Sequence, residues 1–162
     1  MATTAEEEAP MYLKNCWYVA AWAHELDTDT GLLARIILDE PVVLCRMRDG
    51  TLAALADRCP HRYLPLSLGT ITEDGIRCGY HGLEFDRTGV CIRVPGQSRP
   101  PPDARVRCYP VAEKWRWIWI WMGEPDRADE ALIPDYHWND DPDWLSIGDR
   151  FHVRGGYRLL ID

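Results

Sequence analysis

Two short pairs of cysteine and histidine constrain what this chain can fold into more than any other feature. Cys59 and His61 form Cys-x-His, and sixteen residues later Cys78 and His81 form Cys-x-x-His. Two thiolates and two imidazoles can hold zinc or an iron–sulfur cluster. Paired zinc ligands usually have two or more residues between them, because both must reach one tetrahedral ion. Each half here mixes one thiolate with one imidazole, which favours a two-iron cluster with both cysteines on one iron and both histidines on the other.

The flanking residues resemble the Rieske domain of Rieske non-haem iron oxygenases. The resemblance rests on Asp-Arg-Cys-Pro-His-Arg at 57–62 and Cys-Gly-Tyr-His-Gly-Leu at 78–83. Further similarity at residues 17–22, 41–44, 85–86, 94–97 and 118–123 extends it from about Tyr12 to Asp135. It implies a [2Fe–2S] cluster whose ligands are Cys59, His61, Cys78 and His81. A zinc-binding interaction module, in which the same four side chains hold one ion, is an alternative.

Short apolar and β-branched segments separated by turn residues predict an all-β fold. Asp49-Gly50 is a strong hairpin signal, and the turn at residues 86–89 separates two further segments. The expected strands cover residues 32–38, 41–47, 51–56, 76–78, 83–85, 90–94, 106–109 and 115–122. These strands, taken together with the resemblance, predict a Rieske-type antiparallel β-sandwich and a smaller cluster-binding subdomain.

Both ligand pairs are expected on hairpin loops within residues 57–85, without an apolar core of their own. Ser67, Gly69, Gly79 and Gly82 are small residues that let the loop backbone approach the cluster, so that N–H groups can point at its sulfur atoms. Residues 99–103, Arg-Pro-Pro-Pro-Asp, form an extended segment expected to run over the surface near the cluster.

Four tryptophans alternate along residues 115–121, while Ile118, Ile120 and Met122 occupy the intervening positions. Because side chains alternate between the faces of a strand, both faces are apolar and the strand is expected to be buried on both sides. A tryptophan ladder that conducts electrons is the alternative to plain packing. Packing is favoured, because aromatic side chains contribute so much buried area to protein cores.

The chain is expected to divide into three parts. Residues 1–11 predict a disordered acidic tail, residues 12–123 the Rieske domain, and residues 124–162 an acidic linker. The last seven residues, 156–162, resemble the first strand of the oxygenases' catalytic domain. The net charge of −8 arises largely from the linker, since residues 124–149 carry nine acids and one arginine, whereas residues 9–123 carry 13 acids and 14 basic residues.

Three positions separate this chain from respiratory-type Rieske proteins. Those proteins have two extra cysteines that form a disulfide beside the cluster, where this chain has Leu64 and Tyr80. They also have a serine that donates to a bridging sulfide, where this chain has Leu83. The missing donor removes a stabilisation of the reduced cluster, which favours the low end of the Rieske range of about −150 to +300 mV. The leucine also resembles the vanillate O-demethylase and toluenesulfonate monooxygenase type.

The resemblance implies one-electron transfer from a reductase of flavin or ferredoxin type to a mononuclear Fe(II) site. In the family that site lies in a following catalytic domain, which hydroxylates or demethylates aromatic compounds within a homotrimer. No catalytic residue of that domain can be assigned here, so the sequence is expected to be truncated before it. A stand-alone Rieske ferredoxin is the alternative, although small carriers end soon after the last sandwich strand.

Several other classes of function are not supported by the sequence. There is no basic stripe with interleaved aromatics for nucleic acid and no run of 18 apolar residues for a membrane span. His24, His137 and His152 have no partner at ligand spacing. Cys16, Cys45, Cys91 and Cys108 are expected to be reduced, packed thiols, which indicates a cytoplasmic protein. Arg58, Arg62, Arg77 and Arg93 are candidates for a positive rim that faces an electron donor.

Overall fold

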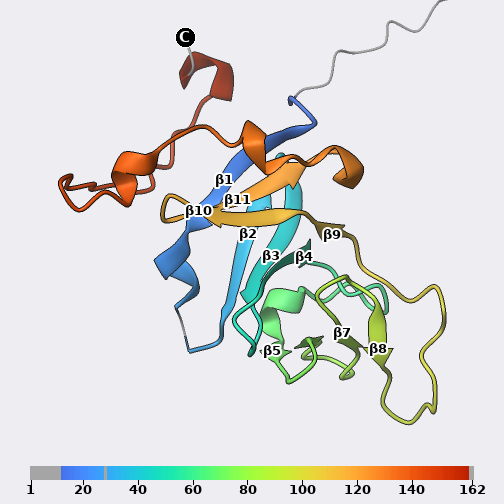
Figure 1. Ribbon diagram of the computed structural model, residues 1–162. Helices are drawn as coiled ribbons and strands as arrows, with labels where there is room; N and C mark the ends of the chain where they lie inside the picture. Colours follow the sequence, from blue (N-terminus) through green and yellow to red (C-terminus); the bar gives the residue numbers. More distant parts are fainter. Residues whose placement is uncertain (1–11, 28, 161–162) are drawn as a thin grey trace, which may run out of the picture.

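The computed structural model describes residues 12–27 and 29–160, and this part of the chain is all-β, as predicted (Figure 1). The tail expected at residues 1–11 lies outside it. Besides strands, the described residues form short 3-10 helices: η1 (Ala23–Leu26), η2 (Leu66–Leu68), η3 (Pro125–Arg127), η4 (Glu130–Leu132), η5 (His137–Asn139) and η6 (Tyr157–Leu160). No helix in these ranges is long and apolar enough to span a membrane.

Two antiparallel sheets form the sandwich. One has the order β1 (Cys16–Trp22), β11 (Trp117–Met122), β10 (Val111–Lys114), and the other β2 (Leu32–Ile37), β3 (Glu40–Arg46), β4 (Leu52–Ala56), β9 (Cys108–Tyr109). The predicted hairpin at residues 49–50 is confirmed, since β3 and β4 pair antiparallel across it. Gly50 has a φ of +84°, which favours glycine, and the Asp49 carboxylate accepts a hydrogen bond from the Thr51 hydroxyl at 2.7 Å.

A third antiparallel sheet builds the smaller subdomain at one end of the sandwich (Figure 1). Its order is β5 (Thr70–Ile71), β6 (Ile76–Arg77), β7 (Glu84–Phe85), β8 (Cys91–Arg93). The strands are short, and the β6–β7 connection carries Cys78 and His81. The segment between β4 and η2 carries the other pair, Cys59 and His61.

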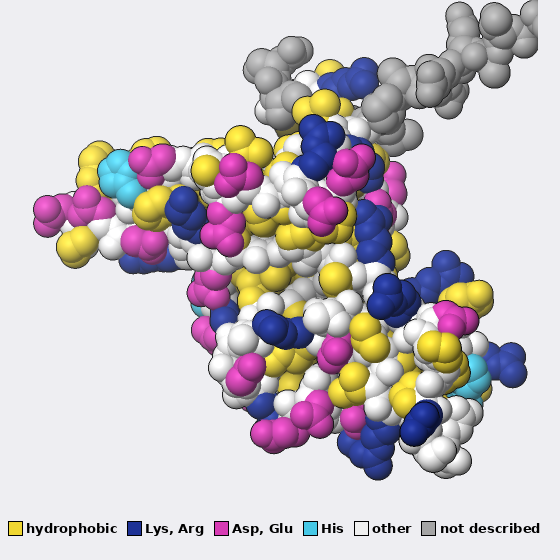
Figure 2. Space-filling model, turned by 45° about the vertical axis from the view of Figure 1, so that its right-hand side comes forward, with side chains coloured by type: hydrophobic (Ala, Val, Ile, Leu, Met, Phe, Trp, Pro, Cys, Tyr) yellow, Lys and Arg dark blue, Asp and Glu magenta, His cyan; other side chains and the backbone are white. Residues whose placement is uncertain are grey.

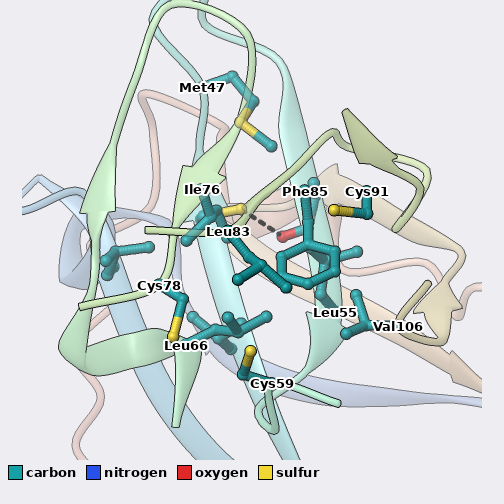
Figure 3. Packing of buried hydrophobic residues seen from close by; sticks show 14 residues of the cluster. Met47, Leu55, Cys59, Leu66, Ile76, Cys78, Leu83, Phe85, Cys91 and Val106 are labelled. Carbon is teal, nitrogen blue, oxygen red and sulfur yellow. Dashed lines mark hydrogen bonds between the residues drawn. The ribbon is translucent and has the colours of Figure 1, made fainter. Parts of the chain in front are cut away.

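The ligand loops, expected to have no apolar core of their own, share one with the sandwich. Leu66, Ile76 and Phe85 have no exposed surface, and they cluster with Val43 and Leu55 of the sandwich (Figure 3). The same cluster contains Cys59 and Cys78. The subdomain is therefore joined to the sandwich by shared apolar packing as well as by the chain.

Strand β3 separates this cluster from the core between the two sheets. Val43 belongs to the subdomain cluster, whereas its neighbours Val42 and Leu44 pack in a cluster that includes Ile118 and Ile120 of β11. All five side chains are fully buried. Because side chains alternate along a strand, one strand contributes to both cores.

Strand β11 is buried on both sides, as predicted. Its isoleucines face the core between the sheets, and Trp119, which is 4% exposed, packs in a separate cluster outside. That outer cluster includes Ile133 and Tyr136, so part of the predicted acidic linker covers the sandwich. Trp115 precedes the strand, in a hairpin turn with a φ of +59°.

The strand predicted at residues 156–162 is not present in the described residues. Tyr157–Leu160 forms the 3-10 helix η6, and residues 161–162 lie outside the described part of the chain. A strand requires a partner for its backbone N–H and C=O groups. None of the described sheets extends to this segment.

Candidate metal centre

The first ligand loop is a closed turn that follows β4. The Cys59 N–H donates to the Leu64 carbonyl oxygen at 2.9 Å, and the Tyr63 N–H donates to the Cys59 carbonyl oxygen at 2.8 Å. Within this turn, the backbone N–H groups of His61 and Arg62 act to lower the pKa of the Cys59 thiol. Such donors stabilise a thiolate, which suits a loop around a metal cluster.

The second ligand loop connects β6 to β7. The Cys78 N–H donates to the Leu83 carbonyl oxygen at 2.8 Å, and the Gly82 N–H donates to the Cys78 carbonyl oxygen at 3.1 Å. Gly82 has a φ of +75°, so glycine fits this turn best. A Cβ at Gly79 would lie 2.8 Å from the Leu68 carbonyl oxygen, so this glycine lets the second loop approach the backbone of η2.

The fold brings the four predicted ligands together as two distinct pairs. Cys59 and Cys78 are 2% and 3% exposed and pack in the same apolar cluster. Figure 3 shows both sulfurs beside Leu66, at one end of the apolar cluster. His61 and His81 are exposed, with ring centroids 4.6 Å apart. The thiols thus lie inside and the imidazoles outside.

The protonation of Cys59 depends on these surroundings. Burial raises the pKa of the Cys59 thiol, and the neighbouring Cys78 thiol acts in the same direction. The N–H groups of His61 and Arg62 oppose this effect, because they stabilise a thiolate. A metal ion at this position would reverse the balance, since a coordinating thiol is deprotonated.

The donor set fits a two-iron cluster. The four predicted ligands form one pair of buried thiols and one pair of exposed imidazoles. That division matches a Rieske cluster, in which two histidines replace two cysteines on one of the two irons.

A cavity of about 460 Å³ opens beside His61 and His81. Its walls are largely apolar, formed by Pro60, Leu83, Val94, Pro95, Gln97, Pro101 and Ala104. Pro101 belongs to the proline-rich segment at residues 99–103, so that segment runs beside the site, as expected. The cavity gives the two imidazoles a partly apolar border.

The arginines expected as a positive rim are mostly held by partners within the chain. Arg77 donates from Nε to the Glu84 carboxylate at 2.6 Å, and Arg93 lies 3.8 Å from the same carboxylate. Arg58 stacks over the ring of Tyr63 at 3.9 Å. Glu84 is 4% exposed and is the cross-strand neighbour of both arginines, so it helps to hold β6, β7 and β8 in register.

Sequence reasoning missed two buried carboxylates at this site, those of Asp57 and Glu84. Glu84 had a detectable signal, because it lies in a predicted strand between two other strands that each carry an arginine. Asp57 is 8% exposed, and its carboxylate accepts hydrogen bonds from Ser67. No spacing rule marks that pair, since it joins a loop residue to the short 3-10 helix η2.

Of the remaining sequence candidates, Cys91 packs in the same apolar cluster as Cys59 and Cys78. All six cysteines are free, with Cys45 and Cys91 buried and Cys16 and Cys108 partly exposed. The imidazole Nδ1 of His137 lies 3.1 Å from the Asp135 carboxylate.

Residues 16–110 match the Rieske [2Fe–2S] domain family. The chain is 45% identical over 152 residues to the iron–sulfur subunit of the toluene-4-sulfonate monooxygenase system of Comamonas testosteroni, covering 94% of this chain and 44% of that protein. Over 152 residues it is also 45% identical to the oxygenase component of dicamba O-demethylase of Stenotrophomonas maltophilia, covering 93% and 44%.

The fold is shared as well. The crystal structure of dicamba monooxygenase bound to dicamba has a TM-score of 0.87 and 43% identity, over 93% of this chain and 45% of that chain. The chain therefore spans less than half the length of these relatives. The family match over residues 16–110, together with the shared fold, shows that this chain belongs to the Rieske [2Fe–2S] domain family.

Proposed function

We propose that this chain transfers single electrons through a Rieske [2Fe–2S] cluster. Cys59 and Cys78 bind an inner iron in this proposal, and His61 and His81 bind an outer iron. The observation that supports it best is the division of one site into two buried thiols and two exposed imidazoles. Such a division insulates the sulfur-bound iron and leaves the histidine-bound iron next to the surface, where a partner protein can approach.

The residues of the chain set the conditions for this chemistry. When bound, the cluster supplies a one-electron redox couple. The N–H groups of His61 and Arg62 stabilise negative charge on the Cys59 sulfur. Leu83 offers no side-chain donor where respiratory-type proteins have serine, which supports a potential near the low end of about −150 to +300 mV. A potential at this low end suits a cluster that receives electrons from reduced nicotinamide through a reductase.

The longer relatives indicate the setting of this activity. Their names describe a toluene-4-sulfonate monooxygenase subunit and a dicamba O-demethylase component. We infer that this chain acts as the N-terminal part of an aromatic-compound oxygenase and receives electrons from a flavin- or ferredoxin-type reductase. In this proposal it passes them to a mononuclear Fe(II) site in a catalytic domain, within a cytoplasmic homotrimer. The free cysteines support a reducing compartment.

A stand-alone ferredoxin is less well supported. Similarity to the oxygenase components covers 93–94% of the chain and therefore continues beyond the family match at residues 16–110. Ile133 and Tyr136, which lie beyond that match, pack against the sandwich. A small carrier does not require these residues.

The ligand assignment can be tested on the isolated 162-residue chain. Anaerobically purified protein should contain two irons and two acid-labile sulfides per chain, with a one-electron paramagnetic signal after reduction. Cys59→Ser should lose the cluster, because a hard alkoxide replaces thiolate poorly at this iron. Cys91→Ser is the matched control, since Cys91 is also a buried thiol of the subdomain cluster. Stoichiometric zinc without labile sulfide would overturn the proposal.

A further inference from the structure

Asp57 and Ser67 form a hydrogen-bonded pair between the first ligand loop and η2. Ser67 donates to the Asp57 carboxylate from its backbone N–H at 2.7 Å and from its hydroxyl at 2.6 Å. The Asp57 N–H donates to the Pro41 carbonyl oxygen of β3 at 2.9 Å. A buried carboxylate is costly unless hydrogen bonds satisfy it. The pair therefore holds η2 in a defined position relative to the sandwich.

The end of η2 rests directly on the second ligand loop. A Cβ at Gly69 would lie 2.2 Å from the Arg77 carbonyl oxygen, and a Cβ at Gly79 would lie 2.8 Å from the Leu68 carbonyl oxygen. These distances leave no room for a side chain, so the two backbone segments are in contact. The contacts involve both chain neighbours of Cys78.

A continuous path of contacts thus joins the two thiol ligands without passing through a metal. Asp57 lies two residues before Cys59 and holds Ser67, and residues 68–69 touch the neighbours of Cys78. We propose that Asp57 and Ser67 are positioning residues that fix the two ligand loops relative to each other, and so set the geometry and the reduction potential of the cluster. This inference rests on the proposed function.

Loss of the Asp57–Ser67 hydrogen bonds should change the reduction potential of the cluster, because the backbone N–H groups near Cys59 would be less well oriented. The loop that Asp57 begins carries Cys59 and, shortly after it, backbone N–H groups at His61 and Arg62 that can serve as donors to the cluster. Less well directed donors stabilise the reduced, more negative cluster less, so the potential should fall. A loop with several positions should also broaden the paramagnetic signal of a frozen sample, because that signal is the sum of the signals of all geometries present.

The cleanest test changes Ser67 and leaves the Asp57 charge in place. Ser67→Ala should lower the equilibrium constant for reduction about threefold and broaden the paramagnetic signal of the reduced cluster. Ser67→Thr keeps the hydroxyl and should restore both properties. Thr88→Ala is the matched control, because Thr88 makes the same two bonds to Asp86, at 2.8 Å and 2.7 Å, in an exposed turn of the same subdomain. It should change neither property.

Changes at Asp57 separate position from charge. Asp57→Asn retains a carbonyl that accepts from the Ser67 N–H and an amide that can donate to its hydroxyl. It should keep the g values and line widths of the wild type, whereas Asp57→Ala should broaden them. If Asp57→Ala does not fold, the Ser67 variants still decide the question.

Three results would overturn the inference while leaving the proposed function intact. Ser67→Ala could keep the wild-type potential and spectrum and lose only thermal stability, which would make the pair purely structural. Asp57→Asn could alter the spectrum as much as Asp57→Ala, which would assign the effect to charge. Thr88→Ala could match Ser67→Ala, which would show that the effect is not specific to the path. Failure of the wild type to hold a [2Fe–2S] cluster would instead refute the proposed function.

Discussion

The backbone N–H of Cys78 donates to the carbonyl oxygen of Leu83 at 2.8 Å, which closes the second ligand loop on a residue of the apolar cluster. Leu83 is 9% exposed and clusters with Cys59 and Cys78. One residue thus fixes the loop through its backbone and shields the thiols through its side chain.

Leu83→Ser should raise the reduction potential and lower stability. A hydroxyl at this position can donate to a sulfur of the cluster and favour the reduced state. The lost apolar side chain should cost about 2–4 kcal/mol in the free energy of unfolding. Redox titration and urea unfolding measure the two effects. Leu83→Ala, which has no donor, should lose stability without the rise in potential. A rise of equal size in both variants would contradict the role of the hydroxyl.

Removal of the metal should release the tips of the ligand loops and leave the rest folded. Residues 59–64 and 78–83 carry the four predicted ligands, and metal binding free energy contributes to folding there. Ile76 and Phe85 are packed against the sandwich and should keep their protection. Hydrogen exchange of the apo-protein measures this difference. Equal protection of tips and sandwich strands would show that the loops are preformed.

Gly79→Ala should destabilise the protein by about 1–3 kcal/mol, because its Cβ would overlap the Leu68 carbonyl oxygen. Gly156→Ala is the control, since nothing lies within 4 Å of a Cβ at that position. Thermal or urea unfolding of the two variants provides the measurement. A Gly79→Ala variant as stable as the control would mean that η2 can move away from the second loop at little cost.

Glu40→Gln should lower the free energy of unfolding at neutral pH but not in acid. Burial raises the pKa of the Glu40 carboxyl, yet hydrogen bonds from Lys14 and Tyr109 and the charge of Arg107 outweigh it and lower the pKa below the ordinary 4.5. The carboxylate therefore stabilises the fold above pH 4.5, and this contribution is lost as pH falls through the lowered pKa. The difference from wild type should be below about 1 kcal/mol at pH 7, because the pair with Lys14 is partly exposed.

Urea unfolding at pH 7 and pH 3 measures this difference. Glu73→Gln, at an exposed acid, is the control and should match the wild type at both values. A Glu40→Gln variant that differs from wild type equally at both pH values would contradict the titration argument.

The ligand pairs and the fold class could be predicted from the sequence because they depend on local features. Cys59 and His61 are held close by one intervening residue, and the Asp49-Gly50 turn determines its own hairpin. The alternation around Ile118 and Ile120 predicted a strand buried on both sides for the same reason, since the period of a strand is a backbone property.

Tertiary structure decided the features that join distant segments. The Asp57–Ser67 bond and the placement of Glu84 between two arginines depend on how strands and loops pack, which no local pattern specifies. The core of the subdomain was missed because it includes sandwich residues such as Val43. Residues 156–162 read as a strand, but a strand forms only where another backbone can accept its hydrogen bonds, and the described residues give Tyr157–Leu160 a 3-10 helix instead. Local sequence therefore determined which residues are predicted as ligands, and long-range packing determined how those residues are held.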